Sequence, residues 1–265
     1  MVRFQVIGTV EVSGPSGACA LRMPLRAALL TALAVESNFC VPTGKLLSVL
    51  WDDAPASALA NLRTNVAHLR KSLDDVSPRL ADRLITARGT GYRLLVHAGE
   101  LDLVEFRSLA AAARVHLKAG NVAKACAQSQ QALALWRGPF GEGLPRTRWL
   151  EAHAAGLESM RIQIVEDLYA ARLLLGDHLR LSHDAATLLS DEPHRERPWL
   201  VLMAVQQLSG DSARAMATFR RCRTHFAQAL GIDPPSSSTE LHHAILDRDD
   251  ARVLDIVRRD VAGVA

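Results

Sequence analysis

The sequence is short of the residues that build disulfide-linked or metal-bound folds. Its 265 residues include four cysteines, and aromatic residues make up only 5% of it. The cysteines lie far apart, with no CxxC pair and no Cys/His spacing that suits zinc. We therefore expect buried thiols in a reducing compartment, and we expect neither a metal nor a cofactor. The four residues are Cys19, Cys40, Cys126 and Cys222.

Membrane segments and catalytic motifs are missing as well. No apolar run reaches transmembrane length, and the alternating N-terminus lacks the apolar core of a signal peptide. The patterns GxxxxGK(S/T), GxSxG and HExxH do not occur. We expect a soluble cytoplasmic protein that is not an enzyme and does not contact the membrane. The histidines at 178, 183, 242 and 243 are interpreted as surface or helix residues.

Positive charge is concentrated in one stretch of the chain. The formal net charge is +3, and residues 1–100 carry all of it, with 11 Lys and Arg against 8 Asp and Glu. Within residues 55–95 the count is 7 against 3, whereas residues 101–265 hold 20 of each sign. A polyanion such as nucleic acid would meet this excess, although many neutral domains also have a local basic face.

Residues 55–73 have the periodicity of an amphipathic helix. Apolar side chains recur every three or four residues, at Leu59, Leu62, Val66, Leu69 and Leu73. The opposite face has Arg63 and Arg70 on its flank and no carboxylate before Asp74. Such a face suits a DNA groove, and it equally suits a helix face that contacts only solvent. The residues of this face are Ser57, Asn61, Thr64, His68 and Lys71.

The stretch after this helix favours the first of these interpretations. Two short strands, 84–86 and 92–96, flank Arg88-Gly89-Thr90-Gly91, where the glycines allow the positive φ angles of a hairpin tip. Upstream we predict a small antiparallel sheet within residues 2–23, a helix over 25–36 and a second helix from Pro42-Thr43. Pro55 is expected in the first turn of the third helix.

Three helices followed by a hairpin form a winged helix-turn-helix. In that fold the third helix lies in the major groove, and the hairpin reaches the adjacent phosphates or the minor groove. Arg88 is then the cation of the wing, Thr90 can hydrogen-bond the DNA backbone, and the Tyr92 ring can close the wing onto the helices.

The second half of the sequence predicts helices only. Gly120-Asn121, Gly176-Asp177 and Gly210-Asp211 repeat one pattern, in which Gly ends a helix and Asn or Asp caps the next. The last two glycines are 34 residues apart, the period of tetratricopeptide repeats. Such helical pairs stack into a concave protein-binding surface and rarely catalyse reactions.

The predicted fold is therefore mainly α, with small sheets near the N-terminus. We expect a winged-helix domain over residues 1–97 and a tetratricopeptide-like helical domain over 98–247. A C-terminal tail, 248–265, is expected to form a short helix.

Several motifs resemble known modules of transcriptional regulators. The segment 85–94, ITARGTGYRL, and the loop 50–55, LWDDAP, resemble OmpR/PhoB-type DNA-binding domains. The segments 132–139, 193–199 and 230–234 resemble the bacterial transcriptional activator domain. Their combination over residues 2–247 is similar to the actinobacterial antibiotic regulatory proteins, the SARP family. OmpR/PhoB-type domains usually follow a receiver, and because this one begins at the N-terminus we do not expect control by a phosphorylated receiver aspartate.

The resemblance implies a pathway-specific activator of secondary metabolism. Members bind direct repeats of double-stranded DNA near the −35 element, often as a head-to-tail pair of two copies. They also contact RNA polymerase, including the sigma factor, through the helical domain and through the loop that here contains Asp52 and Asp53. An acidic loop at a helix break is also an ordinary turn, and that interpretation stays open.

The sequence departs from the family pattern in the two helices that would meet DNA. The first helix commonly begins Pro-Lys-Gln-Arg and here begins Pro24-Leu25-Arg26-Ala27, which leaves Arg26 as one cation. The third helix commonly reads Leu-Gln-Thr-Tyr-Val-Ser-Arg-Leu-Arg and here reads LRTNVAHLR over residues 62–70, so that Thr64 and Arg70 match. The predicted DNA contacts are Arg26, Arg63, Thr64, Asn65, His68, Arg70, Lys71, Arg88 and Thr90.

Four of these departures bear on how DNA is bound. We predict that Arg63 contacts guanine and that Asn65 contacts adenine, while Ala67 and His68 weaken DNA affinity and make polymerase contacts more necessary. The alternative is an interaction adaptor whose winged helix no longer binds DNA. DNA binding by residues 1–97 alone would exclude that alternative.

Overall fold

The structure, a computed structural model, describes residues 1–87, 90–178 and 180–263. The chain forms two compact units. The first contains Met1–Ser108 and Ala132–Arg161, and the second contains residues 109–131 and 162–263. Across the described residues, every helix is too short or too polar to span a membrane.

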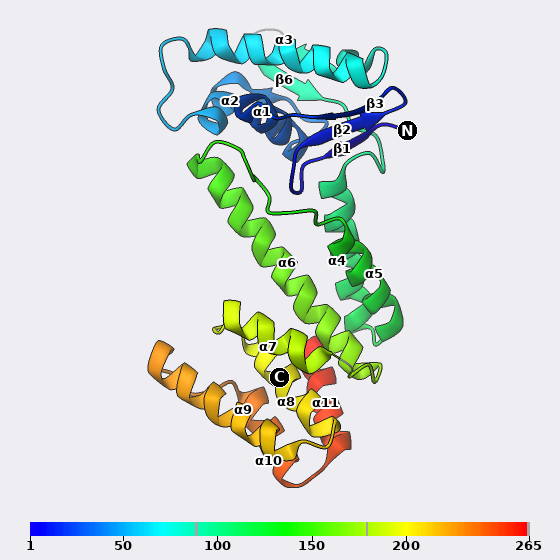
Figure 1. The fold of residues 1–265 in the computed structure, drawn as a ribbon, viewed down its shortest axis with the longest axis vertical. Coiled ribbons are helices and arrows are strands. Elements are labelled where there is room, and N and C mark those ends of the chain that lie inside the picture. The colour runs from blue at the N-terminus through cyan, green and yellow to red at the C-terminus, as the bar shows by residue number, and fades with distance from the viewer. Residues whose placement is uncertain (88–89, 179, 264–265) are drawn as a thin grey trace. The chain divides into compact units, whose positions relative to one another are not determined.

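The first unit contains the predicted winged helix (Figure 1). An antiparallel sheet of β1 (Arg3–Gln5), β2 (Glu11–Gly14) and β3 (Gly17–Ala20) precedes the three helices. These are α1 (Pro24–Val35), α2 (Thr43–Leu50) and α3 (Ala58–Val76), and α3 packs on both others. After the short helix η1 (Leu80–Arg83), β5 (Leu84–Ala87) and β6 (Gly91–Leu94) form the wing. The expected fold class is confirmed.

The apolar stripe of α3 holds this helix on the others. Leu62, Val66, Leu69 and Leu73 are all buried, as the periodicity predicts. Leu59 does not belong to the stripe, because 42% of it is exposed and Ala58 takes the buried position one turn before Leu62. The helix also begins at Ala58, three residues later than predicted, since residues 52–57 form a loop. Pro55 therefore lies before the helix and not in its first turn.

The wing sheet has a third strand that the sequence did not predict. β4 (Val41–Pro42) pairs with β6, so the strand order is β4-β6-β5. Gly91 faces β4 so closely that a Cβ atom would lie 2.0 Å from the carbonyl oxygen of Val41. The prediction of a positive φ at Gly91 is wrong, because its φ is not in that range. This glycine is needed for space, and Gly89 lies outside the described residues.

Residues beyond the winged helix complete the first unit. The carboxylate of Asp102, the first residue of α4 (Asp102–Lys118), accepts hydrogen bonds from the N–H groups of Val6 and Ile7 at 3.0 and 3.1 Å. Burial raises the pKa of this carboxyl, while those N–H groups favour the charged form. Thr147, just before α6 (Arg148–Leu174), donates its hydroxyl to the carbonyl of Val49 at 2.9 Å. The unit thus joins segments distant in sequence.

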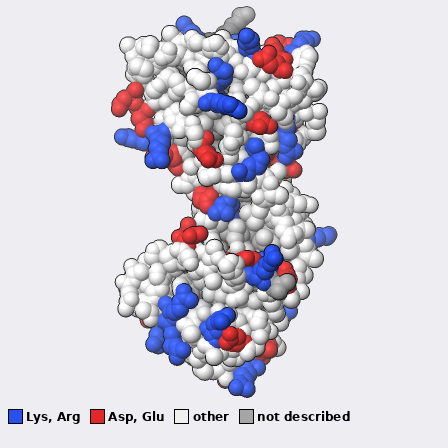
Figure 2. Space-filling view, viewed as in Figure 1, with Lys and Arg blue, Asp and Glu red and all other residues white. Residues whose placement is uncertain are grey.

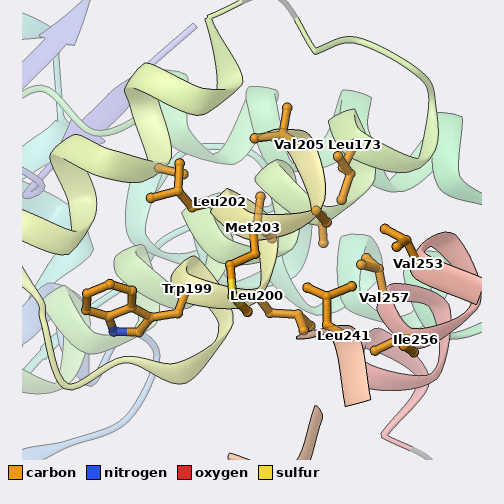
Figure 3. Close-up of a cluster of buried hydrophobic side chains, with 14 of the residues drawn as sticks. Leu173, Trp199, Leu200, Leu202, Met203, Val205, Leu241, Val253, Ile256 and Val257 are labelled. Carbon is orange, nitrogen blue, oxygen red and sulfur yellow. The ribbon is translucent and has the colours of Figure 1, made fainter. Parts of the chain in front are cut away.

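The second unit is an array of helices around α8 (Glu196–Leu208). Every residue of α8 from Pro198 to Gln207 is buried, and Figure 3 shows its apolar side chains meeting those of α10 (Ser236–Leu246) and α11 (Asp250–Ala262). α7 (Leu181–Asp191) and α9 (Ser212–His225) pack on α8 as well. The unit also receives part of α5 (Val122–Ala134), and the π-helix η2 (Phe226–Leu230) follows α9. A helix buried on all sides explains the long apolar run WLVLMAV.

The predicted Gly-Asp pairs have two different outcomes. Gly210 has a φ of +82° after α8, and the Asp211 carboxylate accepts the N–H of Arg214 at 3.0 Å, which caps α9 as predicted. Gly176 likewise has a positive φ, but Asp177 caps no helix within the part of the chain that the structure describes. Its carboxylate accepts from Arg172 at 2.9 Å, and α7 begins only at Leu181.

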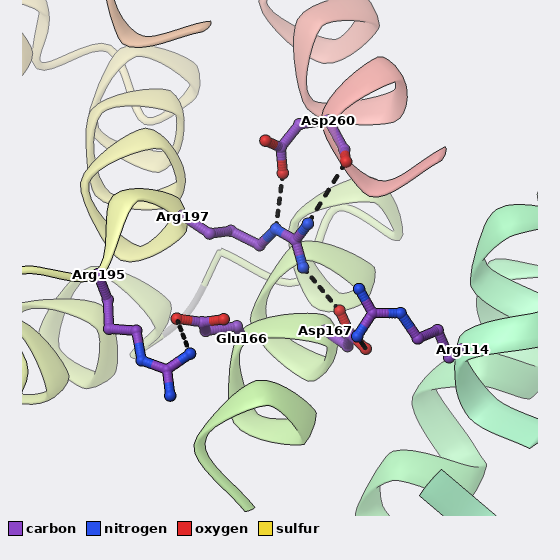
Figure 4. Close-up of polar contacts among 6 residues, drawn as sticks. All are labelled: Arg114, Glu166, Asp167, Arg195, Arg197 and Asp260. Carbon is purple, nitrogen blue, oxygen red and sulfur yellow. Dashed lines mark hydrogen bonds and ion pairs between the residues drawn. The ribbon is translucent and has the colours of Figure 1, made fainter. Parts of the chain in front are cut away.

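The segment predicted as a C-terminal tail contains α11, which packs into the core of the second unit through Val253, Ile256 and Val257. An ion-pair network joins it to two other helices (Figure 4). Arg197 of α8 donates to Asp260 of α11 at 2.6 Å and to Asp167 of α6 at 2.8 Å. Burial raises the pKa of the Asp167 carboxyl, which Arg197 opposes. Such buried pairs fix geometry more than they add stability.

The thiols are not all buried. Cys126 and Cys222 are buried, as expected, and burial raises the pKa of Cys222 to about 12. Cys40 is exposed and Cys19 is half-buried, so the expectation of four buried thiols is wrong for these two. Cys19 lies within β3 and Cys40 directly before β4, and these small sheets have one face open to solvent.

The close approach of β4 to Gly91 predicts a large effect of a single methyl group. Gly91→Ala should destabilise the first unit by about 1–3 kcal/mol, because the new Cβ must push the β4 backbone away. Thermal unfolding followed by circular dichroism measures this. Gly44→Ala is the matched control, since nothing lies within 4 Å of its Cβ position in α2, and it should be neutral or stabilising. Equal melting temperatures for the two variants would contradict the packing argument.

Candidate nucleic-acid interface

The outward face of α3 carries the side chains that the sequence assigns to DNA. Asn61, Arg63, Thr64, His68 and Lys71 are exposed, and the buried stripe lies on the other side of the helix. Within the described part of the chain, Arg63, His68 and Lys71 have no hydrogen-bond or ion-pair partner. Their positive charge and N–H groups are therefore directed to solvent or to a ligand.

The short polar residues of this face are held by the helix itself. The hydroxyl of Thr64 donates to the carbonyl of Ala60 at 3.1 Å, and the amide of Asn65 donates to the carbonyl of Asn61 at 2.9 Å. Asn65 is only half-exposed. Its second N–H and its carbonyl oxygen have no partner in the described chain, which leaves the donor and acceptor pair that adenine recognition needs.

Arg70 has a different environment from the other cations. It is half-buried, and its guanidinium donates to the carbonyl of Leu84 at 2.7 Å and to the hydroxyl of Thr86 at 2.8 Å. Both acceptors belong to β5 of the wing. The side chain thus ties α3 to the wing and uses its donors within the protein, which the sequence pattern alone did not indicate.

The wing itself is described in part. Arg88, its predicted cation, lies outside the described residues. Thr90 is exposed, its N–H donates to the carbonyl of Ala87, and its own carbonyl accepts the N–H of Thr43 at 3.0 Å. Thr90 is therefore fixed to the start of α2, and its hydroxyl lies 4.0 Å from the sulfur of Cys40. Tyr92 is half-buried in β6.

Arg26 belongs to another helix and lies in the first turn of α1. It is half-buried, and its Nε is buried without a hydrogen-bond partner in the described chain. An unpaired buried N–H is costly, so a bound anion or water at this guanidinium would be favourable.

The acidic loop between α2 and α3 is attached to the start of α6. One carboxylate oxygen of Asp52 accepts the N–H of Arg148, the first residue of α6, at 3.1 Å. A carboxylate at a helix N-terminus satisfies an open N–H group and interacts well with the helix dipole. Asp53 is exposed and has no polar partner among the described residues. The two acidic residues therefore have separate roles in the structure.

Sequence reasoning missed the structural roles of Arg70 and Asp52. Arg70 occupies a helix position beside the buried stripe, and its acceptors lie 14 and 16 residues further along the chain. Asp52 caps a helix 96 residues away. No local pattern indicates this contact, because Thr147 already stands at the usual capping position and its hydroxyl accepts the N–H of Leu150 at 3.5 Å.

Comparisons with known proteins agree on the kind of protein this is. A family model described as "Bacterial transcriptional activator domain" matches residues 101–246, and one described as "Transcriptional regulatory protein, C terminal" matches residues 23–94. Regulatory protein AfsR of Streptomyces griseus is 31% identical over 250 residues, which are 94% of this chain and 25% of AfsR. The chain thus spans a quarter of the length of that relative.

Two further comparisons cover more of the other protein. Regulatory protein DnrI of Streptomyces peucetius is 29% identical over 227 residues, which are 83% of each protein. A solved structure of Mycobacterium tuberculosis EmbR in complex with a low affinity phosphopeptide superposes with a TM-score of 0.86 at 27% identity. That superposition covers 99% of this chain and 69% of the EmbR chain.

The hydrogen bonds from the Arg70 guanidinium to β5 predict a loss of local stability when lysine, which has the same charge but a different shape, replaces Arg70. Arg70→Lys cannot reach both acceptors on β5, so the wing should open more often and lose about 1–2 kcal/mol of local stability. Hydrogen exchange of the amides of residues 84–87 measures this, with an expected rise of roughly tenfold. Arg63→Lys, at an exposed position on the same helix, should leave that exchange unchanged. Unchanged exchange in Arg70→Lys would contradict the role given to Arg70.

Proposed function

The chain belongs to the SARP family of transcriptional regulators, and from this premise we propose that it binds DNA directly and activates transcription. The observation that carries the proposal is the outward face of α3. There Arg63, His68 and Lys71 have no partner within the described chain, while Arg70 holds the wing beside them. An unpaired cationic helix face with a fixed hairpin is the arrangement that a DNA groove and its flanking phosphates require.

Each predicted contact has a role in this proposal. Arg63 and Asn65 read base edges in the major groove, as donor to guanine and as donor–acceptor pair to adenine. Lys71 contacts phosphates on one side of the groove. On the same helix, Thr64 and His68 lie at the groove wall. Arg70 serves mainly to orient the wing.

The remaining predicted contacts flank the groove. Arg26, whose guanidinium has a buried Nε without a partner in the described residues, contacts a phosphate at the start of α1. Arg88 and Thr90 bring the wing to the neighbouring phosphates or minor groove.

The proposal extends to how the protein acts at a promoter. Two copies bind direct repeats of double-stranded DNA near the −35 element, in head-to-tail order, and together recruit RNA polymerase with its sigma factor. The target genes belong to secondary metabolism, as in the family this chain belongs to. A protein with this task works in the cytoplasm, where the bacterial chromosome is.

The acidic loop supplies one polymerase contact in this proposal. Asp53 is the residue available for it, because it is exposed and has no partner in the described chain. Asp52 contributes less directly, since one of its carboxylate oxygens caps α6 and thereby fixes the loop.

Removing a phosphate contact should change how steeply the DNA affinity falls with salt concentration. Lys71→Ala should weaken binding to all DNA sequences about equally and reduce the slope of log K against log salt by about 1, because one fewer counterion is released. Fluorescence anisotropy with duplex DNA over a series of salt concentrations measures it. Lys124→Ala, an exposed change of equal charge on α5, is the control and should leave the slope as it is. An unchanged slope in Lys71→Ala would remove Lys71 from the interface, and a wild-type chain without DNA binding would favour an interaction adaptor.

The polymerase contact can be separated from DNA binding. Asp53→Asn should leave promoter DNA affinity unchanged and lower transcription in a reconstituted assay by about two- to fivefold, the range of one exposed charge pair. Asp52→Asn is the matched comparison, because the amide oxygen can still accept the N–H of Arg148 and keep the loop in place. If Asp53→Asn lowers DNA affinity as well, or leaves transcription unchanged, the assignment of this loop to polymerase is wrong.

A further inference from the structure

The second unit has a basic groove that the proposed DNA contacts do not use. One cavity, of about 590 Å³, lies between α7 and α9 and is lined by Arg180, His183, Arg214 and Arg221. A second cavity, of about 490 Å³, is lined by Arg220, Arg221 and His225 with Trp199. Arg221 lines both cavities, so the two lie side by side on α9, and together we call them the basic groove. Among the described residues that line the two cavities there is no Asp or Glu.

The charge of this groove is not neutralised within the protein. Helix α9 contains four arginines and no acidic residue, and Figure 2 shows Lys and Arg side chains gathered on the lower left, where Figure 1 draws α9. Among the described residues, no carboxylate lies within ion-pair distance of Arg180, Arg220 or Arg221. Arg214 alone has such a partner, Asp211 at 3.4 Å, and both side chains of that pair are largely exposed. A cluster of unpaired arginines on one face costs repulsion that an anionic ligand would relieve.

The floor of the groove offers hydrogen-bond donors. Gln206 is 6% exposed, and its side-chain oxygen already accepts the hydroxyl of the buried Thr218 at 2.8 Å. Its amide N–H groups have no acceptor among the described residues. The groove therefore presents guanidinium and amide donors, which match a ligand that has acceptors only, such as a carboxylate.

Apolar groups lie between these donors. Leu202, Ala186 and Ala217 line the first cavity, and the indole of Trp199 lines the second. The guanidinium of Arg221 lies over that indole, 5.7 Å from the ring centre, which fixes the arginine at the junction of the two cavities. A ligand that fills both cavities must combine carboxylates with apolar side chains and must be extended. A single small anion would leave most of the groove empty.

We propose that this groove binds an acidic peptide segment of a partner protein. Arg180, Arg214 and Arg221 pair with its carboxylates, and the accessible Ala186 and Ala217 contact its apolar side chains. A concave groove with both polar and apolar lining residues fits a peptide strand better than a DNA duplex, whose phosphates need a surface that reaches outward. The inference is independent of the DNA contacts proposed for α3, because it concerns the second unit alone.

The test uses the full chain and a fluorescein-labelled peptide in which Glu and Leu alternate. Fluorescence anisotropy should detect binding that falls at least about tenfold when every Glu is replaced by Gln, because charge-assisted hydrogen bonds are lost. Arg221→Glu should weaken binding of the Glu peptide about tenfold or more, and Arg180→Glu, on the opposite wall, should do the same. All variants are first checked for an unchanged melting temperature.

Arg223→Glu is the matched control. It makes the same charge change on the same helix, at an exposed residue that lines neither cavity, and should alter affinity by no more than about twofold. Equal losses in Arg221→Glu and Arg223→Glu would show non-specific attraction and overturn the proposal. A competition experiment compares single-stranded oligothymidylate with unlabelled peptide, both at concentrations counted per negative charge. If the oligothymidylate displaces the labelled peptide at the lower concentration, the proposal is overturned and the groove is assigned to nucleic acid.

Discussion

The guanidinium of Arg70 joins the two elements on which DNA recognition would depend. It extends from α3 to the Leu84 carbonyl and the Thr86 hydroxyl of β5, and this contact sets the wing in a fixed position beside the exposed face of the helix. A helix and a hairpin reach a groove and its phosphates together only if their separation is fixed beforehand, since ordering them on binding would cost affinity. The buried apolar stripe of α3 fixes the orientation of the helix in the same way, because it leaves only the opposite face exposed to a ligand.

A second constraint connects the winged helix to later parts of the chain. Residues 132–161 belong to the same compact unit, where Asp102 accepts N–H groups of the N-terminal sheet and Asp52 caps α6. The loop proposed to contact polymerase is therefore not a freely moving turn. Its conformation depends on the hydrogen bond between Asp52 and the start of a helix 96 residues away, and this bond also holds the neighbouring Asp53 in place.

The sequence predicts the features that local periodicity determines. The stripe of α3 and the hairpin strands follow from side-chain spacing, and the family resemblance follows from motifs that are themselves contiguous. Features that depend on distant segments were missed. The β4 strand and the space that Gly91 leaves for it arise from a chain crossing, and the start of α3 depends on how the preceding loop is attached. The basic groove of the second unit lies between α7 and α9. The sequence did not predict it, because residues 101–265 contain equal numbers of basic and acidic residues and their total charge is zero.

The central claim is that α3 and the wing direct this regulator to promoter DNA. DNase I footprinting of the full chain on the promoters beside its own gene, with and without RNA polymerase, tests it most directly. We predict protection of two direct repeats on one face of the duplex, their centres a whole number of helical turns of about 10.5 base pairs apart, with stronger protection when polymerase is present. No protection at any of these promoters, with or without polymerase, would contradict the claim.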